Sequence, residues 1–457
     1  MKKNSSRVLS LWGAILVLGV SPLWAVQNIP LDQTVEMALQ ANPEVQARWH
    51  VFHAATYGRE AAKAGYRPKL ALRAGVGRDN LDGPGYAGRQ MHSYNRSGVF
   101  LSLSQMIYDG GVTKNEVRRM DHTMKMRYFE LLDVMEVVAL GAIRGHEDVL
   151  RYTSMVELAR ENLERHHALM DRVIRRETAG VGSAVDLETA KGRLALARVN
   201  LATELSNLHD ARSQYLRIVG KMPGEFLKHT ELNLDMSFKL EDAGDRALET
   251  SPKVFAACEH ELSTLYALKA KKGALSPRLD FRASGSLEDD VDGTRGRRDK
   301  AMAELVLSYN IYDGGRDREE IRRFDQLHEE AKAHLKKARW DVRQAASIAY
   351  NDVISLQKKL PLLEQHKKSA EAMRKAYAIQ FEVGRRSLLD LLDAENEAFQ
   401  AQRSYSNAVT NLNLAKAQFL SEQGLLLRAL SVQRDDVPTP EELGLKARSS
   451  GEGHGES

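Results

Sequence analysis

The sequence predicts a mixed but mainly helical chain, in which a long antiparallel α-helical barrel continues into a transmembrane β-barrel. Three observations support this fold class. The chain is an internal duplication, and each half holds two stretches in which apolar and polar residues alternate. Each half then ends in two helical stretches that are too long for a compact globule.

The duplication is visible as motifs that recur in one order along the chain. Residues 103–111 (LSQMIYDGG) return 204 positions later as residues 307–315 (LSYNIYDGG). Gly180 and Asp186 recur at the same offset as Gly384 and Asp390. Pro43 and Pro68 recur at an offset of 209, as Pro252 and Pro277. The five-residue difference between the offsets predicts an exposed loop between the two strands of one half.

These positions and the composition divide the chain into five parts. We expect a signal peptide (1–25), a first structural repeat (26–230), an inter-repeat connection (231–250), a second repeat (251–430) and a polar, disordered tail (431–457). Each repeat is expected to consist of a helix, two strands and then two long helices.

Residues 1–25 have the pattern of a secretory signal peptide. Lys2, Lys3 and Arg7 form its positive start, and the apolar core at 8–20 is shorter than the roughly 20 residues that a membrane span needs. Removing these three from the 66 Lys and Arg leaves 63 against 62 Asp and Glu, a balance that argues against a nucleic-acid partner. The single cysteine, Cys258, excludes an intramolecular disulfide and lies too far from the signal for a lipid anchor there.

Each repeat contains two strands with one apolar face. The apolar positions alternate with other residues at Leu70, Leu72, Ala74 and Val76, at Val99, Leu101, Leu103 and Ile107, at Leu279, Phe281 and Ala283, and at Ala303, Leu305, Leu307, Tyr309 and Ile311. The polar, Gly-rich stretches between the strands of each pair, 78–96 and 288–299, are expected to be loops.

The helices are predicted from capping residues and apolar periodicity. The first is expected from Leu31 to Gly65, with Asp32 as its cap. The long helices are expected at 112–177, 183–219, 316–382 and 387–430. A heptad seam supports the first of these long helices: Val117, Met124, Leu131 and Val138. A helix of that length extends for about 100 Å, which fits a tube.

Four strands cannot close a barrel, and an open sheet edge in lipid would leave backbone groups unpaired. We therefore expect a shared barrel, because three copies give twelve strands and a water-filled lumen, whereas two copies give only eight. The charged residues of the alternate face would line this lumen: Arg73, Arg278, Asp280 and Arg282. Two turns with free glycine dihedrals would convert the returning strands into helices: Asp109-Gly110-Gly111 and Asp313-Gly314-Gly315.

These motifs together resemble the TolC family of outer-membrane efflux and type I secretion channels. The resemblance covers about residues 28–430 and rests on the signal, the duplicated Tyr-Asp-Gly-Gly, the duplicated Gly-(five residues)-Asp-Leu and the opening segment 31–43. It implies a homotrimer in the outer membrane of a Gram-negative bacterium, in contact with lipid and extending into the periplasm. It also implies two partners, a periplasmic adaptor and an inner-membrane pump driven by ATP or by protons.

The resemblance also implies a periplasmic gate at the helix tips. The segment 381–393 (FEVGRRSLLDLLD) is similar to the gate segment, with Asp390 and Asp393 as the ring of carboxylates at the constriction. Arg386, with Asp186 of the first repeat, would make the bonds that hold the tip closed. Phe381 and Val185 depart from the family pattern, because they replace hydroxyl-bearing side chains that could donate or accept hydrogen bonds. Without the resemblance, Asp390 and Asp393 would be read as one solvated face of a helix.

The sequence predicts a passive duct and no enzyme. It contains no phosphate loop, no His-Glu-x-x-His zinc signature and no dinucleotide loop, so we expect no cofactor, metal or catalytic residue. The favoured hypothesis is the exit duct for type I protein secretion, because of the Ser-Gln-x-x-Tyr-Asp-Gly-Gly turn and the missing lipid-anchor cysteine. The alternatives are the outer-membrane part of a small-molecule efflux pump and, in another class, a soluble periplasmic coiled-coil adaptor or scaffold.

Overall fold

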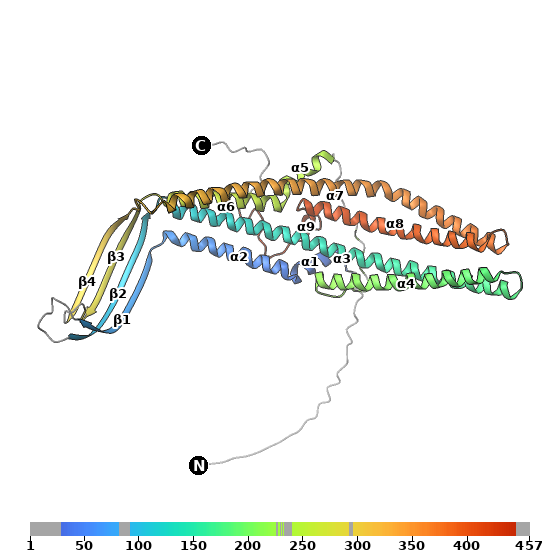
Figure 1. Cartoon of the computed structure of the whole chain (residues 1–457), viewed down its shortest axis with the longest axis horizontal. Helices are drawn as coiled ribbons and strands as arrows, with labels where there is room; N and C mark the ends of the chain where they lie inside the picture. Colours follow the sequence, from blue (N-terminus) through green and yellow to red (C-terminus); the bar gives the residue numbers. More distant parts are fainter. Residues whose placement is uncertain are drawn as a thin grey trace, which may run out of the picture.

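The computed structural model describes residues 29–81, 92–224, 227–228, 230, 232, 240–291 and 296–444. The predicted signal peptide and the end of the predicted tail lie outside these residues. The chain is elongated, with a β-sheet at one end, helices lying side by side through the middle and two helix hairpins at the other end (Figure 1).

The elements follow the same order in both halves. The first half contains α1 (Leu31–Ala41), α2 (Pro43–Lys63), the short 3₁₀ helix η1 (Ala64–Tyr66), β1 (Lys69–Leu81), β2 (His92–Tyr108), α3 (Val112–Thr178) and α4 (Ala184–Val219). The second half contains α5 (Leu240–Thr250), α6 (Pro252–Gly273), β3 (Arg278–Asp289), β4 (Arg297–Ser308), α7 (Arg316–Glu382), α8 (Leu388–Glu422) and α9 (Leu426–Ala429).

The long helices agree with the sequence prediction to within a residue or two at most of their ends. Helices α3 and α7 have 67 residues each, and their start and end positions differ by the offset of 204 that the motifs show. The last helix is shorter than expected, because Gly424 adopts a left-handed φ of 68° and separates α8 from α9. No helix in the part of the chain that the structure describes is both long and apolar enough to cross a membrane.

The first helix is interrupted, which the sequence analysis did not predict. Asn42 ends α1 in an extended conformation, and its side chain accepts a hydrogen bond from the backbone N–H of Glu44 at 2.9 Å. Pro43 then begins α2 at a position where its missing N–H costs nothing. The expected cap Asp32 is wrong, since it lies within the first turn of α1 and Pro30 occupies the cap position.

The four strands form one antiparallel sheet in the order β1-β2-β3-β4. Its strands extend further into the predicted loops than expected, because backbone pairing continues through their polar residues to Leu81 and His92 in the first repeat and to Asp289 and Arg297 in the second. The last strand is shorter than predicted, since β4 ends at Ser308 and leaves Ile311 outside it.

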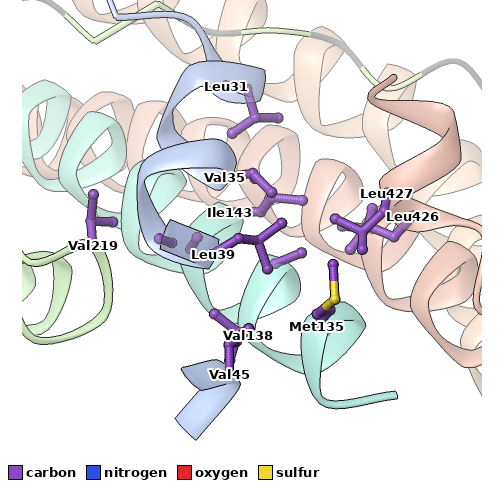
Figure 2. Close-up of a cluster of buried hydrophobic side chains, with 14 of the residues drawn as sticks. Leu31, Val35, Leu39, Val45, Met135, Val138, Ile143, Val219, Leu426 and Leu427 are labelled. Carbon is purple, nitrogen blue, oxygen red and sulfur yellow. The ribbon is translucent and has the colours of Figure 1, made fainter. Parts of the chain in front are cut away.

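The main core lies near the middle of the molecule, where short helices cover the first half of α3. Figure 2 shows Leu31, Val35 and Leu39 of α1 facing Ile143 of α3, with Leu426 of α9 on the other side. The heptad seam is buried here, at Met124, Leu131 and Val138. Because these side chains come from both ends of the sequence, the core joins the two repeats into one body.

Residues 431–444 pack along this core and so differ from the predicted disordered tail. Trp49 and Tyr128 donate side-chain hydrogen bonds to the backbone carbonyls of Asp436 (3.2 Å) and Pro438 (2.7 Å). Arg434 donates to the carbonyl of Leu39 at 3.1 Å. The segment has few apolar residues, but hydrogen bonds to backbone carbonyls hold it in place.

Candidate channel surfaces and gate

The sheet has one apolar and one polar face, and its register keeps them separate across all four strands. On one face Leu70 pairs with Leu103, and Leu279 pairs with Leu307. The other apolar members of this face are Leu72, Ala74, Val76, Val99, Leu101, Phe281, Ala283, Leu287, Ala303 and Leu305. Most of the large ones are exposed in the single chain, as a surface made for lipid must be.

The opposite face of the sheet carries the charged residues that the sequence assigned to a lumen. Asp280 accepts a hydrogen bond from Arg278 at 2.9 Å, and Arg282 lies 3.8 Å from the same carboxylate. Arg73 lies on this face as well, opposite Phe100 of β2. The four charged side chains therefore share one surface, which is chemically suited to water.

Each strand-to-helix turn is fixed by its aspartate. Asp109 accepts hydrogen bonds from the backbone N–H groups of Gly111 (3.1 Å) and Thr113 (2.8 Å), and Asp313 makes the equivalent bonds to Gly315 and Asp317. These bonds and the Arg316 cation hold the pKa of Asp313 below its usual range, against a desolvation effect that would raise it. The carboxylates thus satisfy donors at the starts of α3 and α7.

The glycines of both turns have left-handed backbones. The φ values are 67° and 80° at Gly110 and Gly111, and 76° and 87° at Gly314 and Gly315. L-residues with side chains rarely adopt this conformation, which is a physical reason for glycine at both positions of each motif.

The predicted gate residues lie at the far end of the molecule, where α3 turns into α4 and α7 into α8 (Figure 1). Ser183 and Ser387 cap the two returning helices at equivalent positions. Asp390 completes a capping box, because it accepts hydrogen bonds from the hydroxyl (2.9 Å) and the backbone N–H (3.3 Å) of Ser387. The Ser387 hydroxyl lowers the pKa of Asp390, so the carboxylate is held in its charged form.

Arg386 contacts its own hairpin. Its guanidinium donates to Gln380 at 3.0 Å, lies over the ring of Tyr377 at 4.4 Å and approaches Asp390 at 3.9 Å. The expected bond to Asp186 is not among the interactions of the described single chain, where Asp186 is half-buried in the first turn of α4. Within one chain, the structure therefore brings Arg386 together with Asp390 and leaves Asp186 apart.

Asp393 links the two hairpins. Its carboxylate lies 3.3 Å from Arg193 of α4, while its side chain remains 64% exposed. Behind it, Glu395 is buried and pairs with Arg165 of α3 (3.1 Å) and Arg374 of α7 (3.2 Å). These interhelical pairs were not found from the sequence, because in two of the three pairs the partners are separated by 200 and 230 residues.

Phe381 is buried between the hairpins, where a hydroxyl group would have little access to water. Its side chain is 5% exposed and packs with Leu169, Leu388 and Leu392. The guanidinium of Arg176 lies 4.9 Å from the centre of its ring. The tip is thus held by apolar packing and a cation–π contact at this position.

A buried acid in α3 was also missed. Glu136 is 4% exposed and accepts hydrogen bonds from the backbone N–H groups of Leu426 (3.1 Å) and Leu427 (3.3 Å) at the start of α9. Burial raises its pKa to about 8. Glu136 falls inside an apolar run of the sequence, and that mismatch was the available signal.

The comparisons with known proteins agree with this geometry. The model of the family described as "Outer membrane efflux protein" matches residues 34–221 and 243–421, both repeats and most of the chain. The chain belongs to this family. The protein is therefore an outer-membrane channel component of a Gram-negative bacterium that reaches into the periplasm, as predicted. This location disagrees with the alternative of a soluble periplasmic scaffold.

Individual relatives are distant but cover most of the chain. It is 23% identical to outer membrane efflux protein BepC of Brucella suis over 364 residues, or 79% of this chain and 78% of the relative. It is also 23% identical to outer membrane protein TolC of Escherichia coli, covering 93% and 89%. The crystal structure of VceC from Vibrio cholerae superposes with a TM-score of 0.77 at 14% identity, covering 86% and 96%. The fold class predicted from sequence is confirmed.

Proposed function

We propose that three copies of this chain form the passive exit duct of a tripartite export system, and that its cargo is a protein. The observation that carries the proposal is the amphipathic sheet with two free edges. A sheet of this kind is stable in a membrane only when its edges are paired with those of neighbouring copies. The helices beyond it, 67 residues each in α3 and α7, provide a periplasmic wall about 100 Å long.

Two observations favour a protein cargo. The Ser-Gln-x-x-Tyr-Asp-Gly-Gly turn at 104–111 resembles the secretion branch of the TolC family. One relative is an alkaline protease secretion protein, AprF of Pseudomonas aeruginosa, which is 29% identical over 98 residues. Energy would come from an inner-membrane pump joined to the duct by a periplasmic adaptor.

A second candidate is small-molecule efflux. Three relatives are named for small cargoes: fusaric acid resistance protein FusA, pyoverdine export protein OpmQ and cobalt-zinc-cadmium resistance protein CzcC. These relatives match longer stretches of the chain than AprF does, from 310 to 406 residues. The duct itself is common to both candidates, and only the cargo and the pump differ.

The periplasmic end of the duct would be closed by the helix tips. Asp390 and Asp393 from three copies would place six carboxylates around the opening, a ring that favours cations. Asp186 lies in the first turn of α4, and Arg386 lies directly before Ser387, the cap of α8. We propose that these two residues bond across neighbouring chains. Phe381 would support this tip from behind through its packing with Leu392.

The cargo is tested by deleting the gene and comparing the deletion strain with a complemented one. We expect one or a few proteins to disappear from the culture medium, with unchanged sensitivity to dyes, antibiotics and metal ions. Complementation with Gly110→Ala, which should not fold, is the control for the presence of the gene alone. A normal set of secreted proteins together with increased sensitivity would contradict protein export and support small-molecule efflux.

A further inference from the structure

The polar face of the sheet carries more positive than negative charge. It is made of the odd-numbered residues of β1 and the even-numbered residues of β2, β3 and β4. Seven cations and four acids occupy the register positions of this face: Lys69, Arg73, Arg96, Arg278, Arg282, Arg298 and Lys300, and Asp79, Asp280, Glu288 and Glu304. The face therefore has a net charge of +3 per chain, or +9 in three copies. The chain beyond the predicted signal peptide is almost balanced, with 63 Lys and Arg against 62 Asp and Glu.

Most acids of this face have a cation directly beside them. Glu304 lies opposite Arg282, and Glu288 lies opposite Arg298. Asp280 accepts a hydrogen bond at 2.9 Å from the arginine two residues before it. Opposite charges on neighbouring strands attract and so offset each other in the field of the face. The excess of positive charge must therefore come from cations elsewhere on this face.

One row of residues across the sheet holds cations only. Arg73 of β1 pairs with Phe100 of β2. The row continues through Ser286 of β3 to Lys300 of β4. Arg73 and Lys300 are exposed, and neither has an ion-pair partner among the acids that the structure describes. This row is thus the part of the face where positive charge is least compensated.

The spacing of the two cations determines what kind of anion can meet both. Neighbouring strands lie about 4.8 Å apart, so three strand steps separate Arg73 from Lys300 by about 14 Å. This exceeds the Debye length of about 8 Å at physiological ionic strength, so a small anion interacts with one cation at a time. An extended polypeptide advances about 3.3 Å per residue, so a segment of four or five residues spans the row. Contacts made together by one chain bind far more tightly than the same contacts made separately.

We propose that Arg73 and Lys300 form an anion-binding band in the lumen of the barrel, and that its ligand is an acidic polypeptide. This inference rests on the proposed duct and adds the charge of its cargo. Rings of Arg and Lys favour anions in pores, as rings of Asp and Glu favour cations. The low-dielectric wall of a barrel focuses the field of such a band into the lumen. The band attracts acidic segments of the cargo into the outer end of the duct.

The band and the proposed gate have opposite charge and lie at opposite ends of the molecule. The sheet is at one end of the elongated chain, and the tips of the helix hairpins are at the other (Figure 1). Asp390 and Asp393 place negative charge at the periplasmic end, whereas Arg73 and Lys300 place positive charge in the barrel. An acidic polypeptide inside the duct is therefore repelled by the gate and attracted by the band. Both effects favour movement outward.

Block of the channel by an acidic peptide tests the band. Current through the purified trimer is recorded in planar bilayers, with a short oligoglutamate added on the side of the strand loops. We expect reversible block that weakens as the salt concentration rises. Free glutamate at the same concentration of carboxylate should not block, because it cannot bridge the row. Oligolysine of the same length is the control for the size of the peptide and should not block from this side.

Two variants test the assignment to Arg73 and Lys300. Arg73→Gln with Lys300→Gln should raise the oligoglutamate concentration for half block by at least about tenfold, because the focused positive charge is lost. Arg73→Lys with Lys300→Arg retains the charges and should keep the block.

The matched control removes the same charge from the same two strands. Arg78 and Arg297 belong to β1 and β4 but lie on the opposite face of the sheet. Arg78→Gln with Arg297→Gln should leave the concentration for half block within about a factor of two, because charges outside the barrel are screened from the lumen.

Four outcomes would overturn the band. They are equal block of the wild type by oligolysine, unchanged block of the Arg73→Gln and Lys300→Gln variant, an equal loss in the matched control, and block by inositol hexakisphosphate without block by oligoglutamate. The last would indicate a phosphate ligand in place of an acidic polypeptide. A conducting trimer that oligoglutamate does not block contradicts the band and leaves the duct intact. A monomer in light scattering, or a trimer without conductance, contradicts the duct as well.

Discussion

One substitution tests directly which face of the sheet meets lipid. Leu305 lies on the apolar face of β4, opposite Phe281, and is 65% exposed in the single chain. An arginine near the bilayer midplane on the lipid side of a strand costs roughly 2–4 kcal/mol. Leu305→Arg would appear in all three copies, so the trimer would lose about 6–12 kcal/mol if the sites are independent. This loss is comparable with the total folding stability of many domains.

The control is an arginine of the same size on the other face of the same strand. Met302 lies opposite Ser284 on the polar face and is 41% exposed, so Met302→Arg should reach water in the lumen and cost less than about 1 kcal/mol. The two sites are three residues apart, so differences in depth are small.

The assay is the amount of detergent-resistant trimer in purified outer membranes at equal expression. We expect Leu305→Arg to lower this amount by at least tenfold and Met302→Arg to leave it within a factor of two. Equal yields, or a larger loss for Met302→Arg, would refute the assignment of the faces.

Three further predictions concern the proposed gate, the core and the strand-to-helix turns. The double variant Asp390→Asn with Asp393→Asn should lose cation selectivity and block by multivalent cations in planar-bilayer recordings. Unchanged selectivity in this variant would show that these carboxylates are only a solvated helix face. The single variant Asp390→Ala should also lower thermal stability by about 1 kcal/mol, because the capping box is lost. In the folded protein the pKa of Glu136 is raised to about 8, so Glu136 keeps its proton at pH values at which the unfolded chain has lost it. The free energy of unfolding should therefore fall by a few kcal/mol as the pH rises from about 4.5 to 8. Thermal melts should show a smaller decline for Glu136→Gln, and an identical pH profile would contradict this account. Gly110→Ala should prevent folding of the monomer, as measured by loss of protease resistance. Gly314→Ala should still give a folded monomer but no trimer, as measured by protease resistance and light scattering. A normal yield of trimer from Gly314→Ala would count against a close contact between copies at this position.

The long helices could be predicted because their signal is repeated and strong. A heptad seam and the absence of proline describe α3, and the duplication transfers its bounds to α7. The strands were found from alternation, but their ends were not. Backbone pairing continues through polar residues such as Arg78 and Arg298. The backbone hydrogen bonds that extend the strands there require no apolar alternation, so the sequence pattern could not mark the strand ends.

The place of the proposed gate residues at the helix tips could be predicted from the sequence, but their local bonds could not. The resemblance pointed to Asp390 as a pore charge, and the structure adds that the same carboxylate caps α8 through Ser387. The signal was available, since Ser-x-x-Asp before an apolar run is typical of a capping box.

Contacts between distant segments were beyond the reach of sequence patterns. Arg434 and Trp49 fix residues 431–444 through backbone carbonyls, which carry no residue identity. The pairing of Glu395 with Arg165 depends on how two hairpins pack, and charged residues at helical spacing are common on any helix.

The two free edges of the sheet differ from each other, and this has a consequence for the size of the assembly. An interface that joins unlike surfaces is directional, so each added copy again offers one free β4 and one free β1. Such additions end only when the rotation per copy divides a full turn; otherwise they grow into an open helical fibre. The number of copies is thus determined by the rotation between neighbouring copies, and the packing of the helices beyond the sheet sets this rotation. A substitution that changes how α3 packs on α6 would alter ring closure without touching a single strand.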